Sequence, residues 1–169
     1  YASTGTGTAG HLNMELFKNL TGIDVVHVPY KSIGQAQADL MSGRVVLWIA
    51  SLPGAVPHIK SGRMRALAVS GATRSAGVPE VPTMREAGVA GYEAVSWYGM
   101  FVPVGTPGEA IGKLHDATVR ALQRPDVKER FAALGVEPMG STPEYLARYL
   151  QAEITKWASV VKRTDMRPE

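Results

Sequence analysis

A run of small residues near the start of the sequence has the composition of an anion-binding loop. Residues 3–11 read Ser-Thr-Gly-Thr-Gly-Thr-Ala-Gly-His, between the tail of a strand and the beginning of a helix. Backbone N–H groups in such a loop can point at an anion, and the dipole of the following helix favours negative charge there. A glycine-rich turn that binds nothing has the same composition, so both interpretations stay open at this point.

The same residues match the dinucleotide-binding pattern Gly-x-Gly-x-x-Gly at Gly5, Gly7 and Gly10. Asp24 follows Gly5 by nineteen residues, close to the spacing of the ribose-binding acid in that pattern. That acid belongs at the far end of the second strand, however, and Asp24 stands at its start. No Gly-Lys-Ser/Thr triplet follows, which excludes a Walker loop. A nucleotide-dependent enzyme is therefore the less favoured alternative.

The remaining residues offer little for catalysis or for a metal. The four histidines lie 16, 31 and 57 residues apart, without the i, i+4 pair of a helical metal site. Ser159 and Lys162 match a serine–lysine motif by letters alone, near the end of the last predicted helix. Cysteine is absent, which excludes disulfides, thiolate metal sites and cysteine nucleophiles. We predict a protein that is not an enzyme and holds no metal and no cofactor.

A second loop of the same kind follows the next predicted strand. Residues 30–36 read Tyr-Lys-Ser-Ile-Gly-Gln-Ala and open the next predicted helix. In an open parallel sheet, the loops behind neighbouring strands meet at the carboxyl edge, where ligands bind. Two helix N-termini with serine and threonine hydroxyls suit a small carboxylate better than a bulky nucleotide.

Strand-like and helix-like patterns alternate through the first hundred residues and must position these loops. Leucines at helical spacing predict a helix over 11–20, and further helices are predicted up to about Met41 and over 55–60. The sequence predicts strands over the ranges 23–28, 45–50 and 64–70, the second of them covered on both faces. This order predicts an α/β fold with a parallel sheet.

The middle of the chain changes character. Residues 71–82 are rich in Gly, Ser, Pro and Thr and predict a surface loop. Thr83 and Glu86 then have the spacing of a capping box at the start of a helix. The hydrophobic residues 92–104 are predicted to be extended.

Two long helices are predicted near the C-terminus. The first begins behind a cap at Thr106 and carries an apolar stripe over 111–122, until Arg124-Pro125 breaks it. The last begins behind Ser141-Thr142 and carries a stripe over 146–161. The small sheet before them is not expected to cover both stripes. We therefore predict a homo-oligomer in which these helices pack between copies.

Composition and charge exclude several classes of protein. A chain of 169 residues, 45% hydrophobic and 20% charged, is long enough for a hydrophobic core and is not disordered throughout. A net charge of +3, spread along the chain, gives no basic stripe for nucleic acid. No apolar run approaches the roughly 18 residues of a membrane span. The chain begins at Tyr1, with neither an initiator Met nor a signal peptide, which predicts a processed or truncated front end.

A set of short motifs recurs here in one specific order. They are Ser3-x-Gly5-x-Gly7-Thr8, His11-Leu12, Leu20-Thr21-Gly22-Ile23, His27-Val28-Pro29-Tyr30-Lys31, Asp39-Leu40-x-x-Gly43, Arg65-Ala66-Leu67-Ala68-Val69, Val81-Pro82-Thr83-x-x-Glu86-Ala87-Gly88, Trp97-Tyr98-Gly99, Pro103-x-Gly105-Thr106-Pro107 and Ser141-Thr142-Pro143-Glu144 before Trp157. In these residues the sequence resembles the Bug-type receptors, the periplasmic solute-binding proteins of tripartite tricarboxylate transporters. The resemblance covers essentially the whole chain.

The resemblance implies a two-lobed, Venus-flytrap α/β receptor in the periplasm. It would capture a small organic carboxylate and deliver it to the membrane permease subunits of a transporter. Residues 1–100 would form the second lobe, and residues 101–169 would be a crossover segment and the helices that normally complete the first lobe. Half of the binding cleft would then lie outside this chain.

The resemblance also implies which residues face the ligand. The first loop would form a pincer for the carboxylate, supported by His11, from Ser3, Gly5, Thr6, Gly7 and Thr8. The second loop would contribute Gly34, Gln35 and Ala36. The cleft wall would include Ser51, Ser96 and Trp97.

Four positions depart from the family's pattern. Val46 and Ala50 stand where the family often has acidic residues, Ser32 where it usually has Gly, and Gln35 where it often has Pro. The loss of two acceptors near the cleft argues against amine-bearing ligands such as amino acids, whereas a plain carboxylate remains compatible.

A truncated domain that only self-associates, without a ligand, is the remaining alternative.

Overall fold

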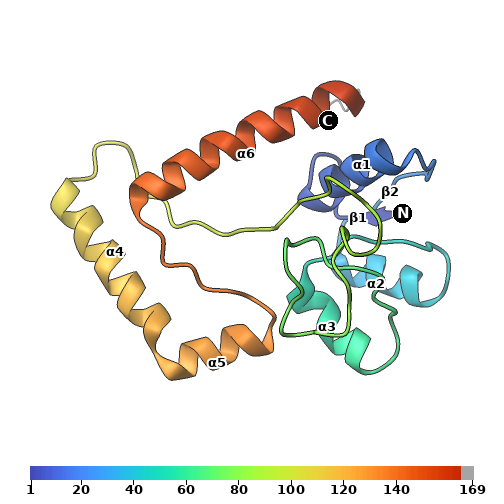
Figure 1. The fold of residues 1–169 in the computed structure, drawn as a ribbon, viewed down its shortest axis with the longest axis horizontal. Coiled ribbons are helices and arrows are strands. Elements are labelled where there is room, and N and C mark those ends of the chain that lie inside the picture. Colours follow the sequence, from blue (N-terminus) through green and yellow to red (C-terminus); the bar gives the residue numbers. More distant parts are fainter. Residues whose placement is uncertain (165–169) are drawn as a thin grey trace.

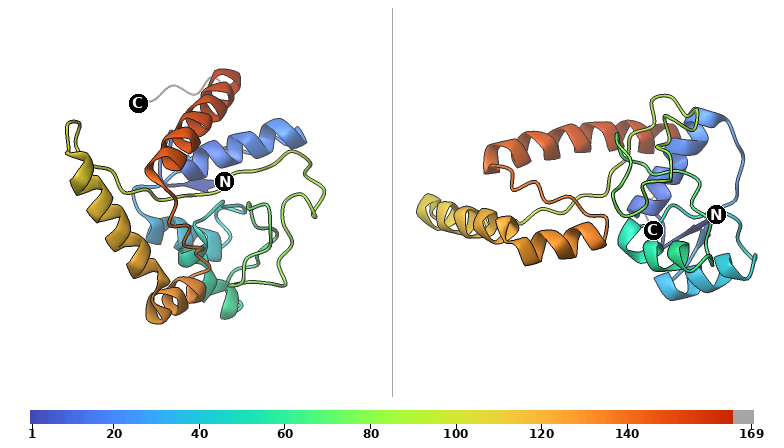
Figure 2. Two further views of the ribbon diagram at one scale, coloured as in Figure 1. Left: turned by 60° about the vertical axis from the view of Figure 1, so that its left-hand side comes forward. Right: turned by 60° about the horizontal axis from the view of Figure 1, so that its bottom comes forward.

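The computed structural model of this chain describes residues 1–164 (Figure 1). Its helices are α1 (Ala9–Thr21), α2 (Ile33–Met41), α3 (Leu52–Lys60), α4 (Gly108–Gln123), α5 (Pro125–Ala133) and α6 (Pro143–Thr164). Its strands are β1 (Ala2–Ser3) and β2 (Val28–Pro29). The first three helices surround the strands, α4 and α5 form a C-terminal arm that extends away from them, and α6 runs back to lie beside α1 (Figure 2).

A short parallel sheet organises the N-terminal part. In β1, Ala2 pairs with Val28 of β2 on one side and forms a bridge to Trp48 on the other, both parallel. The Ala2 amide donates to the Leu47 carbonyl (2.9 Å), and the Val28 amide donates to the Tyr1 carbonyl (2.8 Å). These three segments are followed by α1, α2 and α3 respectively. The predicted α/β order, with parallel pairing, is confirmed.

The strands themselves are shorter than predicted. The strand expected over 23–28 pairs only from Val28 onward, and the one expected over 45–50 makes a single bridge at Trp48. The expected cover on both faces is wrong, because 82% of the Val46 surface is exposed. Ladder hydrogen bonds need a partner on the adjacent segment, and β-branched composition alone does not provide one.

The strand expected over 64–70 is likewise reduced to a bridge between Val69 and Thr83. The capping box behind it is confirmed. The Glu86 amide donates to Thr83 Oγ1 (3.1 Å), and the Thr83 amide donates to Glu86 Oε2 (2.8 Å). A turn follows these residues instead of a helix. The reciprocal bonds therefore stabilise a loop.

Of two predicted helix termini, the end of α1 is confirmed and the start of α4 is not. Gly22 ends α1 in the left-handed conformation (φ 72°), and its amide donates to the Lys18 carbonyl (2.8 Å), as a glycine stop predicts. The cap predicted at Thr106 is wrong. Its hydroxyl donates back to the Pro103 carbonyl (2.8 Å), and Pro107 is the N-cap of α4.

One buried cluster joins the two ends of the chain. Leu16 of α1, Tyr92, Ala94 and Val160 of α6 are all buried in it, and Trp157 packs against it. The Tyr92 hydroxyl also donates to the Asn13 carbonyl of α1 (3.2 Å). The second half of α6 is therefore part of the N-terminal core, and these contacts cross the domain boundary predicted at residue 100.

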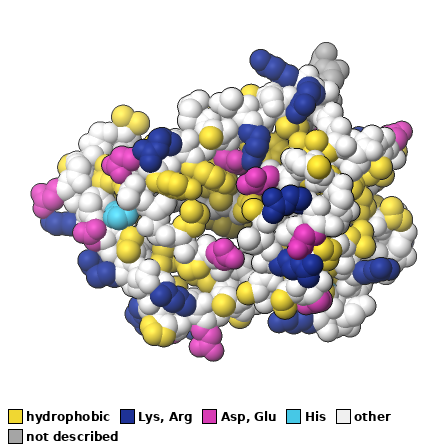
Figure 3. All heavy atoms as spheres, viewed as in Figure 1, with side chains coloured by type: hydrophobic (Ala, Val, Ile, Leu, Met, Phe, Trp, Pro, Cys, Tyr) yellow, Lys and Arg dark blue, Asp and Glu magenta, His cyan; other side chains and the backbone are white. Residues whose placement is uncertain are grey.

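The C-terminal arm itself is open. Neither α4 nor α5 contains a buried residue, and Leu114 on the predicted stripe is 45% exposed. The extended segment before α4 is open as well, with Tyr98 87% exposed. Hydrophobic side chains gather around a hollow between the arm and the core (Figure 3). The homo-oligomer in which a second copy covers these residues stays a prediction.

Candidate functional site

Three helix N-termini lie at the carboxyl edge of the short sheet, because each of its three parallel segments is followed by a helix. These helices surround the strands in Figure 1. Their N-caps are Thr8 for α1, Ser32 for α2 and Ser51 for α3. A Cβ on Gly10 would lie 3.2 Å from the Ile49 carbonyl oxygen, so the first turn of α1 touches the segment that enters α3. Each helix N-terminus carries N–H groups without helical partners and the positive end of a dipole. Their convergence favours an anion.

The glycine loop (residues 3–10) holds its own shape. Gly5 and Gly7 have φ values of 124° and 75°, which side chains other than glycine rarely adopt. The Gly5 carbonyl accepts from Thr8 Oγ1 (2.7 Å), from the Thr8 amide (3.3 Å) and from Ser3 Oγ (3.1 Å). This acceptor is therefore occupied within the loop.

The loop's amides divide into two groups. Three of them fix the loop, because the Gly5 amide donates to Ser3 Oγ (3.1 Å), the Gly7 amide to His11 Nδ1 (3.1 Å) and the Thr8 amide to the Gly5 carbonyl (3.3 Å). A second group makes no hydrogen bond within residues 1–164, namely the amides of Thr4, Thr6, Ala9 and Gly10. The free donors of the loop are thus Thr4, Thr6 and the first turn of α1. Sequence reasoning missed Ala9 and Gly10, although their place directly behind the N-cap was the signal for them.

Ser3 lies behind the loop instead of in front of it. The residue is fully buried, and its hydroxyl lies 2.6 Å from His27 Nε2. The His27 ring stacks on the His11 ring, with centroids 4.0 Å apart and planes 11° apart. Sequence reasoning assigned His27 no role in the site. Its position directly before β2, the strand that pairs with β1, was the signal that it lies beside Ser3.

Charged groups surround this histidine pair. The Tyr1 hydroxyl donates to Glu15 Oε1 (2.8 Å), and Lys18 Nζ donates to the same oxygen (3.0 Å). Burial lowers the pKa of His11, with Glu15 opposing and Lys18 adding to the shift. Burial and the neighbouring His11 lower the pKa of His27. Both imidazoles are therefore uncharged at neutral pH.

The second loop is only partly available. The Gln35 amide donates to Ser32 Oγ (3.3 Å) and the Ala36 amide to the Ser32 carbonyl (3.3 Å), and the Ala36 side chain is buried. The Gly34 amide makes no hydrogen bond within the described part of the chain. Ser51 caps α3 without a side-chain cap bond, which leaves its hydroxyl available. Gly34 with its backbone amide, Gln35 with its exposed side-chain amide and Ser51 with its hydroxyl therefore have groups free to face a ligand.

Trp97 packs on α6. Its ring meets the ring of Tyr149 on α6 edge-on, with centroids 5.5 Å apart. The buried carboxylate of Glu153 on the same helix accepts from Trp157 Nε1 (3.0 Å) and from Lys156. Burial opposes ionisation of Glu153, but these hydrogen bonds outweigh it and lower its pKa. Ser96 is exposed on the same extended segment. These contacts give Trp97 a packing role, and a role of Ser96 and Trp97 at the cleft wall stays a prediction.

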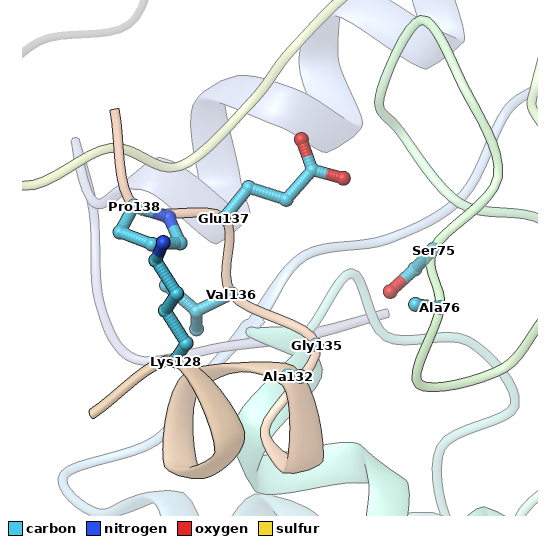
Figure 4. Close-up of a pocket in the computed structure, with 8 residues that line it drawn as sticks. All are labelled: Ser75, Ala76, Lys128, Ala132, Gly135, Val136, Glu137 and Pro138. Carbon is cyan, nitrogen blue, oxygen red and sulfur yellow. The ribbon is translucent and has the colours of Figure 1, made fainter. Parts of the chain in front are cut away.

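A separate cavity of about 250 Å³ lies where α5 meets the loop over 71–82. Ser75 and Ala76 on the loop stand opposite Gly135 and the turn that follows α5 (Figure 4). None of the predicted site residues lines it. Within residues 1–164, no group of three or more His, Asp or Glu side chains is placed to hold a metal ion. No helix in the same range has both the length and the hydrophobicity to cross a bilayer.

Comparison with known proteins decides the family. The model for the tripartite tricarboxylate transporter family receptor matches residues 1–166. This chain belongs to that family. Protein BugT of Bordetella pertussis is 38% identical to this receptor chain over 164 residues, which are 97% of the chain and 50% of BugT.

Solved structures agree with this family. The R. palustris protein Rpa4515 with adipate has a TM-score of 0.90 and 37% identity, over 100% of this receptor chain and 56% of that protein. MatC of Rhodopseudomonas palustris with bound malate has a TM-score of 0.82 and 35% identity, over 95% and 55% of the two chains. The predicted family and the predicted periplasmic-binding-protein-like α/β fold class are confirmed.

The receptor chain spans about half the length of most curated relatives it matches. A relative from Pseudomonas knackmussii, 34% identical, is instead covered over 94% of its length.

Proposed function

We propose that this receptor chain contributes one side of a binding site for a small organic carboxylate. The observation that carries the proposal is the meeting of three helix N-termini at one edge of the sheet, with free amides on Thr6, Ala9 and Gly10. Backbone N–H groups bind a carboxylate without a charged side chain. Two relatives of similar sequence hold dicarboxylates, adipate and malate, in their solved structures.

The proposed contacts are divided among the loops. The free amides of Thr6, Ala9 and Gly10 bind the ligand from the glycine loop, and Gly7 and Thr8 lie beside it there. Gly34 faces the ligand from the second loop and Ser51 from the start of α3. Ser3, Gly5 and His11 act behind the first loop, because their polar groups already fix its shape. The other side of the cleft comes from the part of the longer relatives that this chain does not match.

The receptor delivers its ligand to the membrane permease subunits of a tripartite transporter and works in the periplasm. Family membership supports both statements, and two structural neighbours are named as periplasmic proteins. No nucleic acid partner is proposed, because the charge of +3 is spread along the chain.

The short distance between Ser3 and His27 raises a serine hydrolase as an alternative function. Ser3 Oγ and His27 Nε2 lie 2.6 Å apart, as the nucleophile and base of a serine hydrolase do. Ser3 has none of its surface exposed, however, so a substrate carbonyl cannot reach its oxygen. We propose that the protein is not an enzyme. Turnover of an activated ester that is lost in Ser3→Ala would contradict this.

Calorimetry on the full natural chain tests the proposed ligand. Adipate and malate are compared with adipamide and malamide, which have nearly the same shape without the charge, and with ATP and NAD. We expect heat of binding and a raised melting temperature with at least one dicarboxylate, and none with the matched amides. Equal binding of acid and amide, or binding of a nucleotide alone, would reject the proposal.

A further inference from the structure

Each of the two glycine amides that fix the first loop is tied to a histidine. The Gly7 amide donates directly to His11 Nδ1 (3.1 Å). The Gly5 amide donates to Ser3 Oγ (3.1 Å), and that oxygen lies 2.6 Å from His27 Nε2. The two imidazole rings stack on each other at 4.0 Å. One stacked pair therefore supports the loop at both of its left-handed residues.

The His27 ring has a further neighbour that holds it in place. The Tyr1 ring stacks against it, with centroids 4.9 Å apart and planes 23° apart. The Tyr1 hydroxyl is fixed on Glu15 of α1, the helix that also carries His11. His27 itself precedes β2. The pair thus connects β2 to α1 behind the loop that lies between β1 and α1.

We propose that His27 is a positioning residue of the glycine loop, and that the loop binds a carboxylate only while the His11–His27 pair is uncharged. The inference rests on the carboxylate-binding function proposed above. It predicts a receptor that holds its ligand at neutral and mildly alkaline pH and releases it as the histidines are protonated.

Protonation breaks the support at a specific atom. His11 Nδ1 accepts the Gly7 N–H only when that nitrogen carries no hydrogen. A proton on Nδ1 would place two donors against each other and release Gly7. A charge on His27 is unfavourable as well, because the rings are 4.0 Å apart and a charge on one disfavours a charge on the other.

The charged groups around the pair leave this conclusion unchanged. They are the Tyr1 α-amino group, which donates to the Val26 carbonyl, together with Glu15 and Lys18 of α1. Glu15 alone favours a charged imidazole, but it already accepts from both Lys18 and the Tyr1 hydroxyl. Burial adds to this and lowers the pKa of both histidines.

An imidazolium behind the loop would also attract a bound anion, which is the opposing effect. That attraction has to act across the loop. The loss of the hydrogen bond between the Gly7 amide and His11 Nδ1, which are 3.1 Å apart, changes the loop directly. Whether the affinity for the anion falls or rises on acidification therefore shows which of these two effects is larger.

The experiment measures the dissociation constant for adipate between pH 8.0 and 5.5 on the full natural chain and three variants. The double variant His11→Asn/His27→Gln keeps hydrogen-bonding atoms near Nδ1 of His11 and Nε2 of His27 but does not titrate. His27→Phe keeps a stacked ring and loses the bond to Ser3. His115→Gln, on α4, is the matched control. The double variant also reports what the ionisation of adipate itself contributes.

We expect wild-type affinity to fall about tenfold more than that of the double variant between pH 8.0 and 5.5. His115→Gln should follow the wild type, and His27→Phe should bind about tenfold more weakly already at pH 8.0. Wild-type affinity that changes with pH no more than the double variant's, or that rises on acidification, would overturn the inference. Wild-type affinity in His27→Phe would overturn the positioning role.

A ligand-free measurement separates this inference from the proposed function. The ¹⁵N shift of the Gly7 amide is followed by NMR through the same pH range. We expect it to titrate together with the ring of His11 in the wild type. A Gly7 shift that does not titrate would overturn the inference even if adipate binds. Absence of adipate binding at pH 8.0 with a titrating Gly7 would instead reject the proposed function.

Discussion

Gly10 approaches Ile49 so closely that a Cβ on Gly10 would lie 3.2 Å from the Ile49 carbonyl oxygen. That oxygen belongs to the backbone, which moves less readily than a side chain. The third glycine of the Gly-x-Gly-x-x-Gly pattern is therefore required by the contact between α1 and the segment that enters α3. A phosphate is not needed to explain it, although close helix–strand packing is also the role of this glycine in nucleotide-binding folds.

We predict that Gly10→Ala destabilises the protein although it replaces a glycine inside a helix. Gly112 in α4 is the matched control, because no atom lies within 4 Å of a Cβ there. Gly112→Ala should raise the free energy of unfolding by about 0.5–1 kcal/mol, the usual gain from alanine in a helix. Urea denaturation of both variants checks this. A similar gain in Gly10→Ala would show that the contact with Ile49 is not tight.

Gly7→Val should abolish carboxylate binding while the fold persists. Gly22→Val is its control, since Gly22 has nearly the same φ (72° against 75°) and equally open surroundings. Both variants should lose about 1–2 kcal/mol of stability from the left-handed conformation, and only the Gly7 variant should lose the ligand. Calorimetry with adipate distinguishes them. Equal affinity in the two variants would remove Gly7 from the site.

Most of the helices could be predicted from the sequence, because periodicity and glycine stops are local signals, whereas the helix predicted behind Thr83 is a turn. Gly22 ends α1 as expected, and Gly5 and Gly7 adopt the conformations that their type favours. The extent of the strands could not be predicted, since it depends on a partner segment. Val46, read as a covered strand residue, is 82% exposed for this reason.

The candidate site was predictable only in its outline. The composition of the glycine loop pointed to backbone donors, but the pairing of β1 with β2 brings His27 beside Ser3. A contact between residues 24 positions apart, set by strand register, leaves no local pattern. The same holds for Trp97, whose ring partner Tyr149 comes from the last helix.

Stability should fall on mild acidification because of the same histidines. The folded-state pKa values of His11 and His27 lie below the ordinary 6.5, so between those values and about 6.5 the unfolded chain binds protons that the folded chain does not. Stability is then constant above about pH 7.5 and declines as the pH falls through about 6.5.

Denaturant unfolding from pH 8.0 to 5.5 checks this decline. The pKa of Glu153 is lowered, so its contribution is present above the ordinary carboxyl pKa and is lost only at more acidic pH. The two effects therefore occupy different pH ranges. We expect the decline above pH 5.5 to disappear in His11→Asn/His27→Gln. A decline that persists in that variant would assign it to other groups.

The buried and the exposed face of α6 should differ in their contribution to stability. Val160 is 1% exposed in the core cluster, whereas Ile154 on the same helix is 54% exposed. Val160→Ala should lower the free energy of unfolding by about 1–3 kcal/mol, and Ile154→Ala by less than about 0.5 kcal/mol. Thermal and urea unfolding measure both. Equal losses would contradict the exposure of Ile154 and mean that both faces of α6 are covered.

The most direct test of the central claim is a ¹H–¹⁵N NMR titration of the full natural chain with adipate, using adipamide as the control. The account places the carboxylate at the free amides of Thr6, Ala9 and Gly10. It predicts saturable shifts of these amides and of Gly34 with adipate and none with adipamide. Shifts confined to other residues, such as those around the cavity beside α5, or identical shifts with both compounds, would contradict it.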